Sequence, residues 1–218
     1  MPTVRRLSPP ERDAALDTVV AAFVTDPILR WWFPDDATYP ELAHRFFGVL
    51  LDTRLEGGEV WVVDDGGDVA AVSMWVPPGG NLLGPEVASA RYDEVVEGFP
   101  APSAERIGAS DEVVDALLPV EPHWYLGVLA VHPAHRGSGF GTRVCEPVFA
   151  AADRAGVTVV LETANAANVG YYQRRGFSVL HEAALACADD GTAPEESAPP
   201  AGEPLTVRVM LRAPRKGA

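Results

Sequence analysis

The sequence predicts an α+β fold, a three-layer α/β arrangement of one sheet with helices, and two observations lead to that prediction. An apolar, aromatic-rich run at residues 124–131 is stopped by Pro133, and a second apolar run follows at 157–163. Between them lie a glycine-rich turn and a helical pattern of roughly fifteen residues, and such crossover units place their two strands parallel. The glycine-rich turn therefore lies at the carboxyl end of the first parallel strand.

The N-terminal part of the chain alternates strand and helix patterns. Residues 3–7 form the predicted first strand. Ser8 is predicted to cap the helix that follows, and Asp26-Pro27 to end it. After a short aromatic turn, a second helical pattern covers residues 41–55 and is closed by two glycines. We therefore expect two amphipathic helices before the middle of the sheet begins.

The remaining elements are bounded by turn residues. Residues 60–64 and 69–76 form a predicted hairpin around an Asp-Gly-Gly turn. Two helical pieces are predicted within 85–118, because glycine and prolines interrupt the pattern there. After the crossover unit a strand continues over 177–182, and alternation over 205–212 predicts the final strand.

Composition fits a compact domain with an acidic surface. The 218 residues, of which 47% are hydrophobic, can bury a core as a single domain, 1–218. The formal net charge of −14 argues against a nucleic-acid partner and suits either a cationic substrate or simple solubility. The acidic segment at about 187–204 is predicted to be a flexible loop.

No targeting or membrane signal is visible in the sequence. No apolar stretch approaches the roughly 18 to 20 residues that span a bilayer, so no membrane partner is expected. The N-terminal residues lack the long apolar core of a secretory signal. We therefore expect a cytoplasmic protein.

The most informative motif is the glycine-rich turn. It consists of Arg136, Gly137, Ser138, Gly139, Phe140, Gly141 and Thr142. Glycines let the backbone approach a ligand closely, and a helix start offers unpaired N–H groups to an anion. The spacing differs from the dinucleotide fingerprint, and no Gly-Lys-Ser/Thr follows as in a nucleotide P-loop. The motif therefore predicts an anion cradle of another kind, or a plain glycine turn without a ligand.

With its neighbouring segments, this turn resembles the signature of the GCN5-related N-acetyltransferase (GNAT) family. The signature reads Leu129-Ala130-Val131-His132-Pro133, then Arg-x-x-Gly-x-Gly from Arg136, then Asn165 and Tyr172-Gln173-Arg174-Arg175-Gly176-Phe177. A closer likeness to puromycin N-acetyltransferase-like proteins includes segments 21–27, 59–66 and 121–126. The resemblance implies the GNAT fold, with an acetyl-CoA-binding core at about 122–182. Its sheet is mixed, mostly antiparallel and twisted, with about seven strands, a splayed central parallel pair and helices on both faces.

The resemblance also implies acetyl-CoA as cosubstrate and a set of residues that bind it. The loop N–H groups would hold the pyrophosphate, and the main chain at the end of the preceding strand would bind the pantetheine arm. Asn165 and Asn168 are candidates for the pantetheine or adenine side, although Asn168 is equally suited to capping the next helix. The candidate cofactor-binding residues are Leu129, Ala130, Val131, Arg136, Gly137, Ser138, Gly139, Phe140, Gly141, Thr142, Asn165 and Asn168.

Two side chains are candidates for catalysis. The resemblance makes Tyr172 the general acid, because a phenol with a pKa near 10 stays protonated at neutral pH and can donate to the leaving sulfur. Tyr171 fits a packing role better. Glu162 is the candidate general base, because a carboxylate in an otherwise apolar strand must face something polar. Its alternative is an ion pair with Arg143 or Arg175.

Other residues give weaker signals. Cys145 and Cys187 fit no metal or redox spacing, and we expect Cys145 to be a small buried residue. His132 and His135 share the loop region without a third ligand, so no metal is expected. Glu121, Glu59 and Asp26 are further acids that the sequence cannot place. One or two aromatic residues at most are expected to line an acceptor pocket, from Trp31, Trp32, Phe33, Tyr39 and Trp75.

Three functions fit these features. The first is transfer of an acetyl group from acetyl-CoA to a primary amine of a small molecule, with an aminonucleoside antibiotic such as puromycin as the sharpest candidate and antibiotic resistance as its consequence. The second is acetylation of a protein or peptide amine. The third is a non-catalytic acyl-CoA sensor, which would need neither Tyr172 nor Glu162. The sequence leaves open the acceptor, the acyl-chain preference and whether the protein is a monomer or a homodimer.

Overall fold

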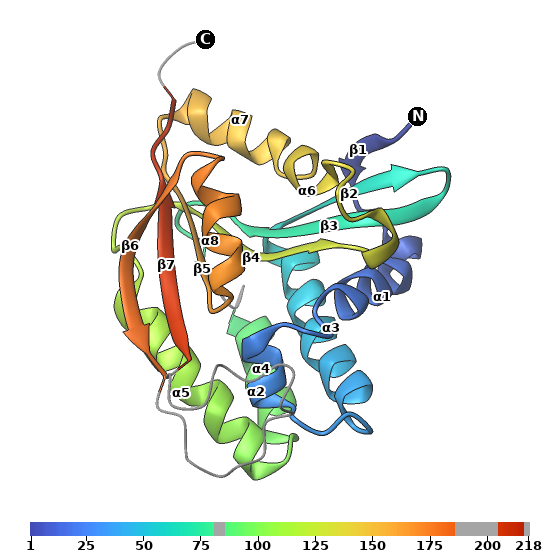
Figure 1. The fold of residues 1–218 in the computed structure, drawn as a ribbon, viewed down its shortest axis with the longest axis vertical. Helices are drawn as coiled ribbons and strands as arrows, with labels where there is room; N and C mark the ends of the chain where they lie inside the picture. The colour runs from blue at the N-terminus through green and yellow to red at the C-terminus, as the bar shows by residue number, and fades with distance from the viewer. Residues whose placement is uncertain (81–85, 186–204, 216–218) are drawn as a thin grey trace.

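The computed structural model describes residues 1–80, 86–185 and 205–215, and within these ranges it contains one seven-stranded sheet in the order β1-β2-β3-β4-β5-β7-β6 (Figure 1). The strands are β1 (Thr3–Arg6), β2 (Glu59–Asp65), β3 (Asp68–Val76), β4 (Trp124–Val131), β5 (Val159–Thr163), β6 (Phe177–Ala184) and β7 (Thr206–Arg212). β4 and β5 run parallel, and the other neighbouring pairs run antiparallel. The predicted mixed sheet with a central parallel pair is confirmed.

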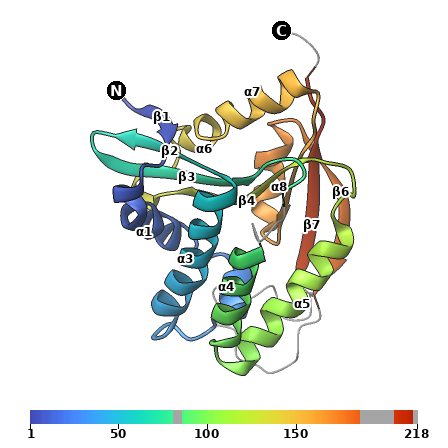
Figure 2. The ribbon, with the colours of Figure 1, turned by 180° about the vertical axis from the view of Figure 1, so that it is seen from behind.

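Helices cover both faces of the sheet, as Figures 1 and 2 show. One face carries α1 (Arg12–Ala22) and α3 (Tyr39–Gly57), with α2 (Pro27–Trp32), α4 (Glu86–Glu97) and α5 (Ala101–Leu117) beyond them. The other face carries α6 (Phe140–Arg143), α7 (Glu146–Ala155) and α8 (Ala166–Gln173). Two short 3₁₀ helices are η1 (Pro9–Glu11) and η2 (Pro133–His135). No helix in the described ranges is long and apolar enough to cross a membrane.

The central parallel pair separates along its length. The ladder between β4 and β5 ends at Leu126 and Leu161, whereas β4 continues to Val131. At the same point the register between β3 and β4 shifts, because Met74 pairs with Val128 and Trp75 with Leu126, which leaves Gly127 as an extra residue. Such a bulge bends a strand and ends its regular pairing. The bulge therefore marks the start of an opening between β4 and β5.

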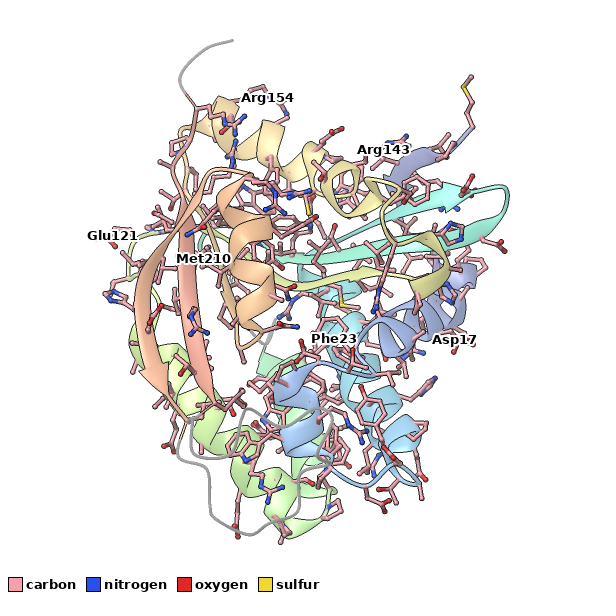
Figure 3. The ribbon with its side chains drawn as sticks, viewed as in Figure 1. Asp17, Phe23, Glu121, Arg143, Arg154 and Met210 are labelled. Atoms are coloured by element: carbon pink, nitrogen blue, oxygen red, sulfur yellow. The ribbon has the colours of Figure 1, made fainter. Side chains whose placement is uncertain are left out.

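Two large apolar clusters, and a small third one around Leu185, Leu205 and Val207, hold these layers together. One lies between the sheet and the helices α1 to α5, with Leu16, Phe33 and Phe47 among its most buried members. The other lies under α6 to α8 and contains Trp75 and Met210. Figure 3 shows Met210 inside the fold, and the exposed Glu121 and Arg154 at its outer edge. The sheet is therefore buried on both faces around the opening.

Three predicted details of the N-terminal half and the crossover are wrong. Ser8 does not cap a helix through its side chain, because its hydroxyl donates to the carboxylate of Glu11. Asp26 does not end a helix but begins α2, where its carboxylate accepts the N–H groups of Ile28 and Leu29. The single crossover helix is divided into α6 and α7, with Cys145 between them.

The other predicted elements are present with small changes at their ends. The second helical pattern is α3, the hairpin is β2 and β3, and the two helical pieces are α4 and α5. The predicted loop at about 187–204 and Cys187 lie outside the described residues. Cys145 is 1% exposed, as expected for a small packed residue.

Candidate active site

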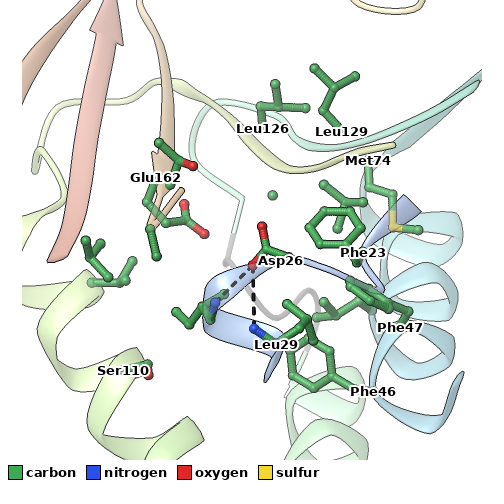
Figure 4. A pocket seen from close by; sticks show the side chains of 18 of the residues that line it. Phe23, Asp26, Leu29, Phe46, Phe47, Met74, Ser110, Leu126, Leu129 and Glu162 are labelled. Atoms are coloured by element: carbon green, nitrogen blue, oxygen red, sulfur yellow. Dashed lines mark hydrogen bonds between the residues drawn. The ribbon is translucent and has the colours of Figure 1, made fainter. Parts of the chain in front are cut away.

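A cavity of about 350 Å³ lies at the opening between β4 and β5. The bulged part of β4 and the end of β5 form one wall, and α2, α3 and α5 form the opposite walls. Figure 4 shows Glu162 on the strand side and Asp26 on the helix side, with Phe23, Phe46 and Phe47 filling one end. The cavity is therefore largely apolar, with a few polar groups that face its interior.

Glu162 is the polar group that β5 brings to this cavity. The residues before it, Val159 to Leu161, are fully buried in the sheet, and Glu162 lines the cavity together with Thr163 and Ala164 at the end of the strand. Its Oε2 is sealed from solvent and has no hydrogen-bond partner in the described part of the chain. Burial raises the pKa of Glu162 to about 7, and its interaction with the Tyr125 phenol offsets part of that rise. The carboxyl can therefore exchange a proton near neutral pH.

Tyr172 enters the same cavity from α8. Its ring is 9% exposed and packs edge-on against Phe177. Burial raises the pKa of Tyr172 above its ordinary value, so the phenol keeps its proton. Tyr171 is not part of the cavity lining. The Arg175 guanidinium stacks on its ring, 3.3 Å from the ring centre.

Further ionisable groups line the cavity, among them Arg54, Asp26 and Asp111. Arg54 comes from the last turns of α3 and is 4% exposed. Burial raises the pKa of Asp26 and of Asp111, each to about 6. Asp111, on α5, accepts a hydrogen bond of 2.9 Å from the hydroxyl of Tyr92. The cavity therefore combines several buried acids with one buried cation.

The glycine-rich loop begins after η2, beyond the carboxyl end of β4, and runs into α6. Gly137 and Gly139 both have φ of 82°, a conformation that favours glycine. Among described groups, the N–H groups of Gly137, Gly139, Phe140 and Gly141 find no acceptor. Unpaired N–H groups at a helix start suit an anionic ligand.

Neighbouring side chains fix this loop in place. The Arg136 guanidinium donates to the carbonyl of Ala22 at 3.1 Å, and Ser138 Oγ donates to the carbonyl of His135. Thr142 Oγ1 accepts from the Nε of Arg175 at 2.9 Å. One donor of the Arg136 guanidinium, the Ser138 hydroxyl and Thr142 Oγ1 are thus used within the protein, and the backbone N–H groups named above have no acceptor among the described residues.

The structure bears on two alternatives that the sequence left open. Glu162 makes no ion pair with Arg143 or Arg175, because Arg143 donates to the carbonyl of Pro2 and Arg175 to Thr142. Asn165 caps α8 by accepting the N–H of Ala167, so the suggestion that Asn168 is the cap is wrong. Asn168 instead lines the cavity.

The structure also places the aromatic residues and the acids that gave weaker signals in the sequence. Among the five candidate wall aromatics, Trp32 lines the cavity, and the other four are not part of the lining. Of the three unplaced acids, Asp26 lines the cavity, and Glu59 accepts the indole N–H of Trp61 at 2.8 Å.

Comparisons with known proteins give the family. The acetyltransferase (GNAT) family matches residues 26–177, which is more than half of the chain. The chain belongs to the GNAT family of acetyltransferases. An uncharacterized N-acetyltransferase of Schizosaccharomyces pombe is 26% identical over 183 residues, covering 79% of this chain and 73% of the relative.

Solved structures show the same fold. A structure from Corynebacterium glutamicum, described as histone acetyltransferase HPA2 and related acetyltransferase, is similar to this chain with a TM-score of 0.68 and 21% sequence identity. The match covers 100% of this chain and 98% of that chain. Arylalkylamine N-acetyltransferase 2 of Aedes aegypti has a TM-score of 0.69 at 14% identity, covering 98% and 99%. This GNAT acetyltransferase therefore shares its entire described architecture with enzymes that differ widely in sequence.

Sequence reasoning missed Arg54, Tyr92, Tyr125 and Asp111 in the site of this acetyltransferase. Arg54 and Asp111 lie on helices whose charged residues ordinarily face water, so their types carried no signal. Only tertiary packing turns them inward, because α3 lies against β2 and β3, α5 lies against β6 and β7, and both helices line the cavity. A cue was present at Gly127, because a glycine inside a strand pattern suggests a bulge or a close approach.

Proposed function

We propose that this GNAT acetyltransferase transfers the acetyl group of acetyl-CoA to the amine of a small molecule by direct attack in a ternary complex. The observation that carries the proposal is the cavity at the splay of β4 and β5, to which neighbouring elements bring Glu162 and Tyr172. A volume of about 350 Å³ lies in the range of small-molecule pockets, which supports a small acceptor over a peptide. We also propose that the protein is located in the cytoplasm.

The loop and the splay fit acetyl-CoA. The four unpaired N–H groups between Gly137 and Gly141 can receive a pyrophosphate, and the positive φ of Gly139 keeps them turned outward. Beyond Leu126, β4 has no strand partner on its β5 side among the described residues, which leaves the main chain of Leu129 to Val131 available to an amide-rich pantetheine arm. Asn165 and Asn168, at the start of α8, lie next to that opening. Bound acetyl-CoA supplies the activated thioester.

The two catalytic side chains divide the proton transfers. Glu162 in its ionised form takes a proton from the acceptor ammonium, so that the neutral amine can attack. Tyr172 holds its proton and donates it to the departing thiolate. The phenol oxygen of Tyr172 makes no hydrogen bond within the described residues, so it is available for that donation.

The test is acceptor-dependent release of CoA, measured with a panel of amines. The panel contains puromycin, arylalkylamines, polyamines, amino acids, an aminoglycoside and a lysine peptide. We expect release with at least one small amine, and Tyr172→Phe to lower turnover by about 100-fold or more while acetyl-CoA affinity stays unchanged. Tyr171→Phe is the matched control, because its ring packs outside the cavity.

Three results would contradict the proposal or a part of it. Release with the lysine peptide alone would favour a peptide acetyltransferase. Tight binding of acetyl-CoA without release for any amine would favour an acyl-CoA sensor. Equal losses in Tyr172→Phe and Tyr171→Phe would remove the special role of Tyr172.

A further inference from the structure

Arg54 is a buried cation without an anionic partner. Its side chain is 4% exposed and lines the cavity. Its Nη1 donates to Thr53 Oγ1 at 3.1 Å, its Nε is sealed from solvent without a partner, and within the described residues no carboxylate lies within salt-bridge distance of it. Burying a charge is costly unless it is paired and hydrogen-bonded. The position of Arg54 is therefore that of a ligand-binding side chain.

Three of the four acids of the same cavity have partners or water. Asp26 accepts two backbone N–H groups at the start of α2. Asp111 accepts the Tyr92 hydroxyl, and Asp115 is exposed to water. The fourth, Glu162, has no partner for its Oε2 among the described residues, so the cavity lacks an anion for Arg54 and a donor, such as an ammonium group, for Glu162.

The place of Arg54 relative to Glu162 limits the shape of that anion. The Arg54 Nη2 lies 3.6 Å from where a Cβ on Gly127 would stand, so the guanidinium is at the bulge of β4. Glu162 and Arg54 are close enough to interact electrostatically, and the phenols of Tyr92 and Tyr125 interact with the same guanidinium. An acceptor at the splay would thus meet a positive and a negative side chain near each other.

We propose that the acceptor is an α-amino acid with an apolar or aromatic side chain, whose carboxylate is bound by Arg54 while its amine faces Glu162. This inference rests on the proposed function. A planar guanidinium binds a carboxylate through two parallel hydrogen bonds, and Arg54 brings its Nη2 to the bulge of β4, at the cavity. The wall formed by Phe23, Phe46 and Phe47 then receives the side chain.

The experiment compares three acceptors that share one side chain, namely phenylalanine, phenylalanine amide and phenethylamine. Wild-type enzyme is compared with Arg54→Gln, Arg54→Lys and the control Arg45→Gln. Arg45 is exposed on the same helix and donates to the carbonyl of Gly98, away from the cavity. The readouts are kcat and KM for each acceptor, the Kd of each acceptor by calorimetry, and the melting temperature of each variant.

We expect phenylalanine to be the preferred acceptor of the wild type. Arg54→Gln should raise the KM and Kd for phenylalanine by about 10- to 100-fold, as expected for losing hydrogen bonds between charged groups. The values for the two acceptors without a carboxylate should not change, Arg54→Lys should recover part of the loss, and Arg45→Gln should match the wild type. A purely structural arginine would instead lower the melting temperature and affect all three acceptors alike.

The possible failures are distinguishable. If phenethylamine is acetylated as well as phenylalanine, and Arg54→Gln changes neither, the inference is overturned while the proposed function stands. If no acceptor is acetylated but phenylalanine binds in an Arg54-dependent way, the proposed function fails and the carboxylate site stands. If an Arg54 variant does not fold, the three acceptors on wild-type enzyme decide, because equal Kd values for all three would overturn the inference.

Discussion

Glu162 and Tyr172 show how one cavity separates a base from an acid. Both side chains are buried, and burial disfavours the charged form of each. For a carboxyl that starts near 4.5 the result is a pKa of about 7, so that both protonation states are populated at neutral pH. For a phenol that starts near 10, the same effect locks the proton on. The same physical cause therefore gives the two residues opposite roles.

The pH dependence of turnover tests the role of Glu162. Because the carboxyl is protonated below its pKa of about 7, kcat/KM should fall as the pH is lowered through 7. In Glu162→Gln, kcat/KM should be lower by about 100-fold or more, and the limb near pH 7 should disappear. The limb that remains in the pH profile of this variant then reflects ionisation of the acceptor amine. It should shift along the pH axis when an amine of different pKa is used. A limb near pH 7 that persists in Glu162→Gln would assign the base to another group, with Asp26 the next carboxyl to replace.

The residue types carried unequal information about this site. Glu162 could be predicted because a carboxylate in an apolar strand is unusual, and Tyr172 because of its place in a family signature. Arg54 could not, because an arginine near the end of an amphipathic helix ordinarily faces water. Its inward direction follows from tertiary packing, and no pattern within α3 encodes it.

Among the elements, strands with a clear alternation of apolar and polar residues could be predicted from the sequence. Helix ends that depend on a proline or on a capping side chain could not. The hairpin β2–β3 and the parallel pair β4–β5 follow from alternation and from glycine turns. The pair Asp26-Pro27 predicts the end of the first helix. An Asp before a Pro is equally typical of a helix start, and here Asp26 is the N-cap of α2 and Pro27 its first residue. Pro147 has the same effect in the crossover, where it begins α7 after the short α6.

The junction between the loop and α6 depends on a glycine for reasons of space. A Cβ on Gly141 would lie 2.6 Å from the hydroxyl of Tyr171 and 3.2 Å from Val131 Cγ2. Tyr171 cannot move away easily, because Arg175 stacks on its ring and donates to its carbonyl. The loop, the end of β4 and the last turn of α8 are therefore packed as one unit.

Gly141→Ala tests that packing. We expect it to lower the free energy of unfolding by about 1–3 kcal/mol, as overpacking does, and to weaken acetyl-CoA binding several-fold because the loop must shift. Gly108→Ala is the control, since a Cβ there meets nothing within 4 Å in the middle of α5. The control should gain about 0.5–1 kcal/mol of stability and leave the affinity for acetyl-CoA unchanged. Chemical denaturation and calorimetry measure both quantities, and an unchanged affinity in Gly141→Ala would separate the loop from cofactor binding.

At the scale of the whole molecule, this acidic chain of net charge −14 includes two kinds of carboxylate that respond to pH in opposite ways. Paired acids such as Glu11, whose pKa the Arg5 guanidinium lowers to about 2, stabilise the fold in their charged form. The cavity acids Asp26, Asp111 and Glu162 have raised pKa values of about 6, 6 and 7, so that their charged forms are the unfavourable ones. The site therefore holds acids whose ionisation opposes folding at neutral pH.

The pH dependence of stability follows from these shifts. Between about pH 4 and pH 7 the native protein binds more protons at the three cavity acids than the unfolded chain does, so the free energy of unfolding falls as the pH rises through this window. Below about pH 4 the paired acids lose their charge and stability falls again. We expect the melting temperature to be highest near pH 5 and to be at least about 3 °C lower at pH 8, the shift that roughly 1 kcal/mol gives in a domain of this size.

A triple variant isolates the cavity acids from the overall charge. Asp26→Asn, Asp111→Asn and Glu162→Gln together keep oxygen acceptors for the α2 cap and for Tyr92, and remove three carboxylates. The control, Asp13→Asn with Asp17→Asn and Asp68→Asn, removes three exposed carboxylates and the same charge. The cavity variant should lose most of the decline in melting temperature between pH 5 and pH 8, because its buried groups no longer titrate, whereas the control should keep it. Equal flattening in both variants would mean that charge repulsion over the whole surface, and not burial at the site, makes this fold less stable at alkaline pH.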